Sequence, residues 1–145
     1  MQFEELPTGR VIKAGRREVT EQEILEFASR YDPQPFHTNP EFAARSRWGG
    51  LIASGWMTCG IAMGLVAREI LPGSASIGSP GVEKIEWPAP VRPGDVLSLT
   101  VTVLESRISS SGRIGIIRWQ WELHNQTETL VLRMIGTSFF EVGSR

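Results

Sequence analysis

Asp32 and His37 are the two side chains of this sequence whose types and spacing best suit proton transfer. They begin and end segment 32–37, which also contains two prolines. Each proline fixes its own backbone φ and biases the residue before it toward extended geometry, so we expect an open loop that costs little entropy to order. Such a loop can present a carboxylate and an imidazole to a cleft as an acid/base pair.

Three helices are predicted around this segment. Residues 20–31 begin with a capping box and carry one apolar face, so a helix should end just before Asp32. Residues 39–47 begin with asparagine followed by proline, which indicates a second, short helix. Ser54 is a suitable N-cap for a third helix over residues 55–71.

The third helix is apolar on nearly every side, so we expect it to be buried all round. The second half of the chain instead favours strands, because apolar and polar residues alternate there. The predicted strands are 82–87, 96–103, 117–123 and 130–140.

Helices followed by an antiparallel sheet predict an α+β domain. We expect a hotdog arrangement, in which the sheet wraps around the long central apolar helix, and a single domain over residues 1–145. One copy of such a sheet leaves an edge strand uncovered, and pairing two copies removes that exposed edge. We therefore predict a homodimer or a dimer of dimers.

The composition of the chain argues against several classes of function. The net charge of −1 argues against a nucleic-acid-binding surface, and Cys59 is the only cysteine, so the chain forms no internal disulfide. Two histidines without clustered ligands argue against a metal site, and no cofactor is expected. His124 lies on the polar face of a predicted strand, so it is not expected to be catalytic. No signal peptide or membrane span is predicted, which favours the cytoplasm.

The chain resembles the MaoC-like dehydratase and R-specific enoyl-CoA hydratase family over residues 27–140. The family's signature is Gly-Asp-x-Asn-Pro-x-His, and Asp32, Pro35 and His37 match its aspartate, proline and histidine. Tyr31 stands where glycine is usual, and Gln34 stands where asparagine is usual.

Two further segments carry the resemblance. Residues 49–55 look like the family's entry into the central helix, with Ser54 where many members have histidine. Residues 91–95, Val-Arg-Pro-Gly-Asp, resemble the turn before a long strand, which recurs across hotdog proteins of several functions.

The resemblance implies a hydro-lyase that adds water to a trans-2-enoyl thioester, giving an (R)-3-hydroxyacyl thioester, or catalyses the reverse. Asp32 and His37 would bind one water, with their exact division of roles left open. The backbone N–H of Gly55, at a helix N-terminus, would stabilise negative charge on the carbonyl oxygen. The substrate would be carried by coenzyme A or acyl carrier protein.

Two alternatives remain open. A hotdog thioesterase would use one carboxylate to direct water at the thioester carbonyl, and a noncatalytic protein would only bind acyl thioesters or a partner subunit. Bulky side chains near the expected pocket favour a short or branched acyl group. They are Trp48, Trp56, Met57 and Met63.

Overall fold

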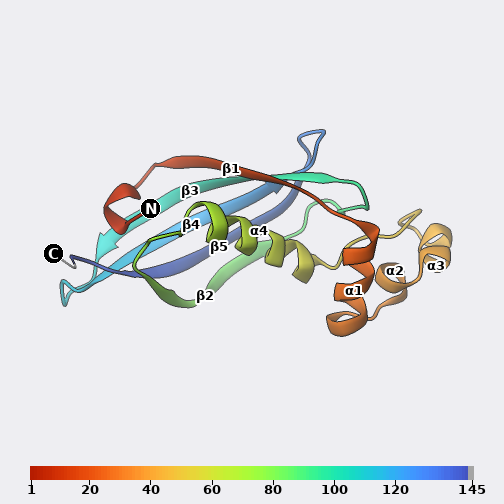
Figure 1. Cartoon of the computed structure of the whole chain (residues 1–145), viewed down its shortest axis with the longest axis horizontal. Helices are drawn as coiled ribbons and strands as arrows, with labels where there is room; N and C mark the ends of the chain where they lie inside the picture. Colours follow the sequence, from red (N-terminus) through yellow and green to blue (C-terminus); the bar gives the residue numbers. More distant parts are fainter. Residues whose placement is uncertain (144–145) are drawn as a thin grey trace.

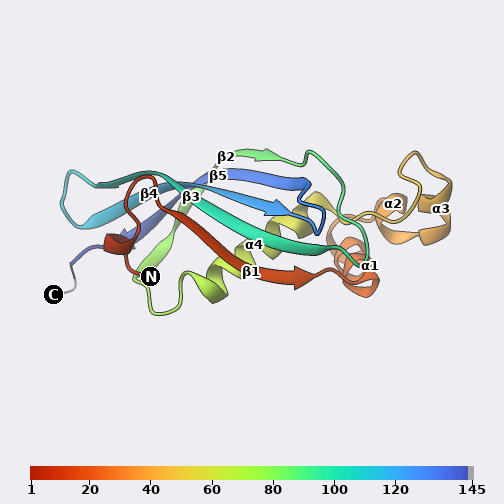
Figure 2. The same cartoon turned by 90° about the horizontal axis from the view of Figure 1, so that it is seen from above.

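A five-stranded antiparallel sheet curves around one long helix (Figures 1 and 2). The structure, a computed structural model, describes residues 1–143. Its elements are η1 (Phe3–Glu5), β1 (Val11–Glu18), α1 (Glu21–Tyr31), α2 (Pro35–Thr38), α3 (Pro40–Arg45), α4 (Gly55–Glu69), β2 (Ser76–Glu86), β3 (Val96–Ile108), β4 (Ile114–His124) and β5 (Leu130–Glu141). The strand order is β1-β3-β4-β5-β2, and the predicted hotdog arrangement is confirmed.

The core lies between the concave face of the sheet and α4. Strands β3 and β4 alternate buried and half-buried residues along most of their length, as the sequence pattern predicted. Burying each large aliphatic side chain contributes roughly 1.5–3 kcal/mol, so this alternation sets which face of the sheet meets the helix. The inward side chains include Leu97, Leu99, Val101 and Val103 of β3, and Ile117, Trp119, Trp121 and Leu123 of β4.

Helix α4 is buried on one face only, so the prediction that it is buried all round is wrong. Met57, Ile61 and Leu65 pack into the core. Trp56 and Met63 lie on the opposite side, where they are 57% and 42% exposed. The single chain therefore presents an apolar stripe along the outside of its central helix.

Strand β1 was not predicted, and it precedes the helices at one edge of the sheet. It pairs with β3 and contains an irregularity in register at Gly15, whose φ is +69°. A Cβ at this position would lie 2.6 Å from Cδ2 of Leu65. Glycine is thus required here by both conformation and space, because the strand passes against α4.

Helices α1, α2 and α3 cluster beyond the end of the sheet, beside the N-terminus of α4 (Figures 1 and 2). The capping box of Thr20 and Glu23 is present, as predicted for α1. The predicted open loop over residues 32–37 is only partly correct, because a short helix, α2, begins at Pro35. Proline suits this first helical position, where no backbone N–H is needed.

In the described part of the chain, no helix has the length and apolar character needed to cross a membrane.

Candidate active site

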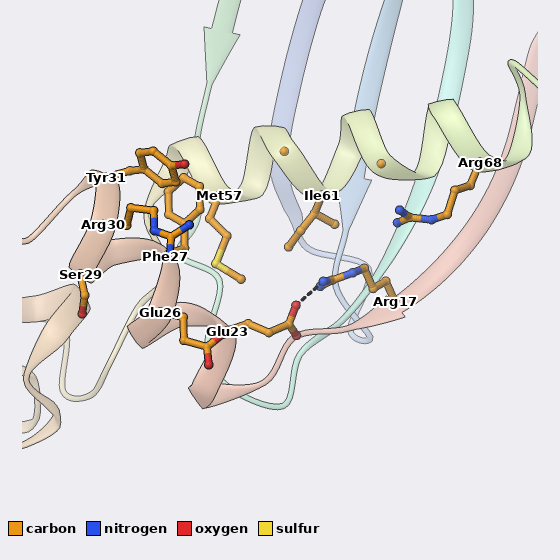
Figure 3. A pocket seen from close by; sticks show the side chains of 12 residues that line it. Arg17, Glu23, Glu26, Phe27, Ser29, Arg30, Tyr31, Met57, Ile61 and Arg68 are labelled. Carbon is orange, nitrogen blue, oxygen red and sulfur yellow. Dashed lines mark hydrogen bonds and ion pairs between the residues drawn. The ribbon is translucent and has the colours of Figure 1, made fainter.

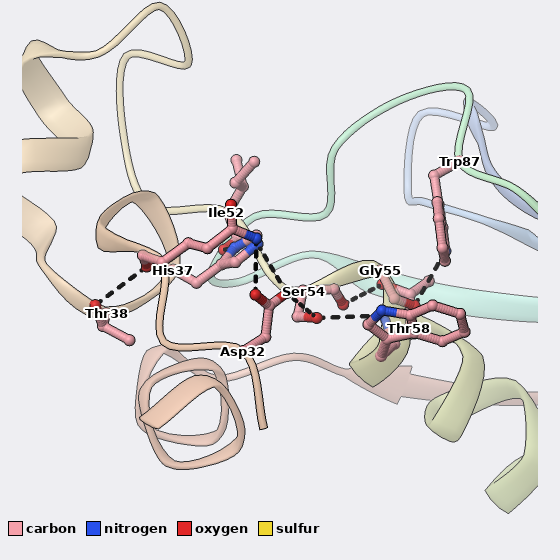
Figure 4. Close-up of polar contacts among 10 residues, drawn as sticks. Asp32, His37, Thr38, Ile52, Ser54, Gly55, Thr58 and Trp87 are labelled. Atoms are coloured by element: carbon pink, nitrogen blue, oxygen red, sulfur yellow. Dashed lines mark hydrogen bonds and ion pairs between the residues drawn. The ribbon is translucent and has the colours of Figure 1, made fainter. Parts of the chain in front are cut away.

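Asp32 and His37 meet at the N-terminal end of α4, as Figure 4 shows. Asp32 caps the C-terminus of α1, and His37 lies on α2. Nε2 of His37 is 3.3 Å from Oδ2 of Asp32, and the two side chains are only 7% and 16% exposed. The structure therefore brings together the two residues that the sequence singled out.

The Asp32 carboxylate accepts two further hydrogen bonds. The Gln34 side-chain amide donates to Oδ1 at 2.7 Å, and the Ser54 hydroxyl donates to Oδ2 at 2.7 Å. Burial alone would raise the pKa of Asp32, but these two hydrogen bonds and the nearby His37 together hold the pKa below its ordinary value. Asp32 is therefore ionised at neutral pH, and the two hydrogen bonds fix the orientation of its carboxylate.

The His37 ring is oriented from its other side by the backbone of Ile52. Nδ1 lies 2.7 Å from the Ile52 carbonyl oxygen, which can only accept a hydrogen bond. Nδ1 must therefore carry a hydrogen, and the second ring nitrogen, Nε2, is the one that gains or loses a proton. This nitrogen faces the Asp32 carboxylate, so the two side chains are placed to act together on one proton.

Ser54 links this pair to the first turn of α4. It is fully buried, and its hydroxyl oxygen also accepts a hydrogen bond from the backbone N–H of Trp56 at 3.3 Å, as an N-cap does. The preceding N–H, that of Gly55, is one of those that a helix leaves without an intrahelical partner. It is available to a ligand at the positive end of the helix dipole.

His37 and Gly55 line the same cavity, of about 200 Å³. Thr58 of α4 and the segment 87–91 between β2 and β3 form other parts of its wall. The arrangement can hold a small polar molecule between a proton-transfer group and a backbone donor. These are the elements needed for general acid/base chemistry on a carbonyl compound.

Trp87 covers Gly55, and sequence reasoning missed it. The indole Nε1 donates to the Gly55 carbonyl oxygen at 3.0 Å, a contact drawn in Figure 4. A Cβ at position 55 would lie 2.4 Å from the indole, so only glycine fits beneath this ring. Trp87 follows the last residue of β2, and its spacing from the motif residues carries no signal that could have revealed the contact.

A larger cavity, of about 980 Å³, lies on the other side of α4 (Figure 3). Phe27 and Tyr31 of α1 face Met57 of α4 there, and Arg17 forms an ion pair with Glu23. Neither Asp32 nor His37 lines this cavity. We therefore place the candidate site at the smaller cavity, which His37 and Gly55 line and beside which the Asp32 carboxylate contacts His37.

The other reactive residue types lie apart from this site. Within residues 1–143, no three His, Cys, Asp or Glu side chains are grouped so that they could hold a metal ion. His124 lines a separate cavity with Lys13 and Ser98. Burial raises the pKa of the Cys59 thiol, which makes it a poor nucleophile.

Known proteins resemble this chain in both sequence and structure. The family model described as MaoC like domain matches residues 3–117. The uncharacterized protein YdeM of Bacillus subtilis is 31% identical over 131 residues, which are 90% of this chain and 92% of YdeM. A 3-hydroxybutyryl-CoA dehydratase of Methylorubrum extorquens is 31% identical over 104 residues, 71% of this chain and 64% of that protein.

Among solved structures, the MaoC-like dehydratase of Rhodospirillum rubrum superposes with a TM-score of 0.86 at 37% identity. The match covers 95% of this chain and 94% of that one. The similarity therefore includes the sheet, the central helix and the helices that carry the candidate site.

Proposed function

Because this chain belongs to the family of MaoC-like domains, we propose that it is a hydro-lyase acting on an acyl thioester. It adds water to a trans-2-enoyl thioester to give the (R)-3-hydroxyacyl thioester, or eliminates water in reverse. One observation carries the proposal: Nε2 of His37 lies 3.3 Å from the Asp32 carboxylate, beside the free N-terminus of α4. Hydration of an enoyl thioester requires an acid/base pair to transfer protons and a donor, here the helix N-terminus, to stabilise the carbonyl oxygen.

Water addition can be balanced on these groups alone. A water held by Asp32 and His37 attacks the β carbon, and one of its protons passes to the pair. The pair then returns one proton to the α carbon, so its own protonation is the same before and after. No oxidation or reduction occurs, and the reaction needs no cofactor.

Negative charge develops on the thioester carbonyl oxygen during the attack. The N–H of Gly55 supports this charge, because it lies at the positive end of α4 and Gly55 lines the same cavity as His37. A single donor of this type lowers a reaction barrier by roughly 3 kcal/mol. The glycine permits a carbonyl group to approach the backbone closely.

We propose acyl-coenzyme A as the carrier, because the Methylorubrum extorquens relative is named for a coenzyme A thioester. The test is to follow the absorbance of crotonyl-CoA together with free thiol. Hydration removes the conjugated absorbance without releasing thiol. Release of thiol at the same rate would instead identify a thioesterase, and binding without either change would identify a noncatalytic protein.

We also propose that two copies associate through β2. This strand is an edge of the sheet, and its residues 76–84 are exposed, which leaves backbone groups open to pairing. The expected mass in sedimentation equilibrium is twice 16.1 kDa, or a further doubling for a dimer of dimers. A monomer at micromolar concentration would contradict the proposal.

A further inference from the structure

Two cavities follow one another along the β2 side of α4. The first is the site cavity of about 200 Å³, whose contacts on α4 are Gly55 and Thr58. The second, of about 430 Å³, begins at the next residue, Cys59, and continues past Met63 between the helix and strands β2, β4 and β5. The two cavities are therefore neighbours along one helix.

Trp87 lines the site cavity at the N-terminal end of α4. Its indole donates to the Gly55 carbonyl oxygen in the first cavity. The same indole acts on the Cys59 thiol of the second cavity, where it partly offsets the rise in pKa that burial causes. Trp56 packs edge-on against it, with ring centroids 5.3 Å apart. Trp87 thus packs against the first turn of α4, one helical turn before Cys59, where the second cavity begins.

The site cavity is small for a substrate tail. Its volume of about 200 Å³ is less than half the 430 Å³ of the second cavity. The reacting water, the thioester carbonyl and the α and β carbons take up most of that space. Little room is left for an acyl chain beyond a short one while the indole stays in place.

The second cavity is suited to hydrocarbon. Met63, Leu71, Val82 and Met134 contribute apolar side chains to its wall, and Trp119 and Trp121 close its floor on β4. Among residues 1–143, no Asp, Glu, Lys or Arg side chain lines it. A chain that continued from the site past Trp87 would meet this apolar space directly.

We propose that Trp87 sets the acyl chain length that this protein accepts, by separating the site cavity from the second cavity. Once the indole is removed, the second cavity is occupied by the hydrocarbon tail of a longer acyl thioester. This inference rests on the proposed function, since the site cavity must hold the thioester. It assigns a specificity-determining role to a residue outside the Asp32 and His37 motif.

The test compares the native protein with Trp87→Ala for hydration of crotonyl-CoA and trans-2-octenoyl-CoA. Each methylene that enters an apolar cavity improves binding roughly fourfold, so four methylenes should raise the octenoyl-to-crotonyl ratio of kcat/KM by up to about 250-fold. Trp87→Phe keeps an aromatic ring in place and should preserve the native ratio. Trp56→Ala removes a neighbouring indole that lines neither cavity, and it should also leave the ratio unchanged.

A binding measurement separates this inference from the proposed function. Calorimetry with the saturated thioesters butyryl-CoA and octanoyl-CoA requires no catalysis, and Trp87→Ala should favour octanoyl-CoA by a similar factor. Adding Met63→Trp to Trp87→Ala refills the second cavity and should cancel that gain. An octanoyl-to-butyryl affinity ratio that is equal in the native protein and Trp87→Ala would overturn the proposal, whether or not hydration is observed. That equal ratio is also expected if a second copy of the chain fills the cavity.

Discussion

Asp32→Asn and His37→Ala should each lower kcat for crotonyl-CoA hydration by about 10²- to 10⁴-fold, the range typical of a lost acid/base group. Asparagine keeps the shape of Asp32 but loses the charge that faces Nε2 of His37. Alanine removes the ring that holds the exchangeable proton. The loss of enoyl absorbance at saturating substrate measures the effect. The double variant should be little worse than either single one, because the two groups act as a unit.

His124→Ala is the matched control, because this histidine lines a different cavity and should keep native activity. Ser54→Ala should give an intermediate loss of roughly tenfold, since it removes one hydrogen bond to Asp32 but keeps the carboxylate. Native activity in both Asp32→Asn and His37→Ala would remove the basis of the hydro-lyase proposal.

Gly55→Ala should reduce hydration by roughly 10²- to 10³-fold, the effect expected when an oxyanion donor is displaced. The new Cβ would lie 2.4 Å from the Trp87 indole, so either the ring or the first turn of α4 must shift. Overpacking of this kind also costs about 1–3 kcal/mol in free energy of unfolding. Steady-state kinetics and chemical denaturation of the same preparation measure the two effects.

Gly60→Ala provides the comparison within the same helix. A Cβ there meets no other atom of residues 1–143 within 4 Å, so the change should stabilise α4 by up to about 1 kcal/mol through helix propensity. Adding Trp87→Ala to Gly55→Ala removes the clash and should recover stability. If Gly55→Ala were as active and as stable as the native protein, neither hydration nor folding would require glycine beneath Trp87.

The parts of the fold that the sequence predicted depend on local patterns. Thr20 and Glu23 specify the start of α1 because a capping box involves only four consecutive residues. The alternation in β3 and β4 identifies their buried face because side chains alternate across any strand. The proximity of Asp32 and His37 was likewise predictable, since five positions separate them.

The remaining features depend on contacts between distant segments. Strand β1 contains Gly15 and several charged residues, so its own sequence does not indicate a strand. It adopts extended geometry because its backbone pairs with β3. Glycines 78 and 81 have positive φ and interrupt the pairing of β2 with β5, so the first half of β2 shows no alternation. Trp87 reaches Gly55 across 32 positions, which no local pattern encodes. The apolar side chains Trp56 and Met63 of α4 are exposed because no other element within residues 1–143 of the single chain packs on that side of the helix.

Three parts of the candidate site come from one short stretch of backbone. The Ile52 carbonyl holds the His37 ring, the Ser54 hydroxyl holds Asp32, and the N–H of Gly55 is free for the substrate. These groups are joined through consecutive peptide units, so the proton-transfer pair and the oxyanion donor move together. A displacement of residues 52–55 relative to a bound substrate would therefore act on His37, Asp32 and the Gly55 N–H at the same time.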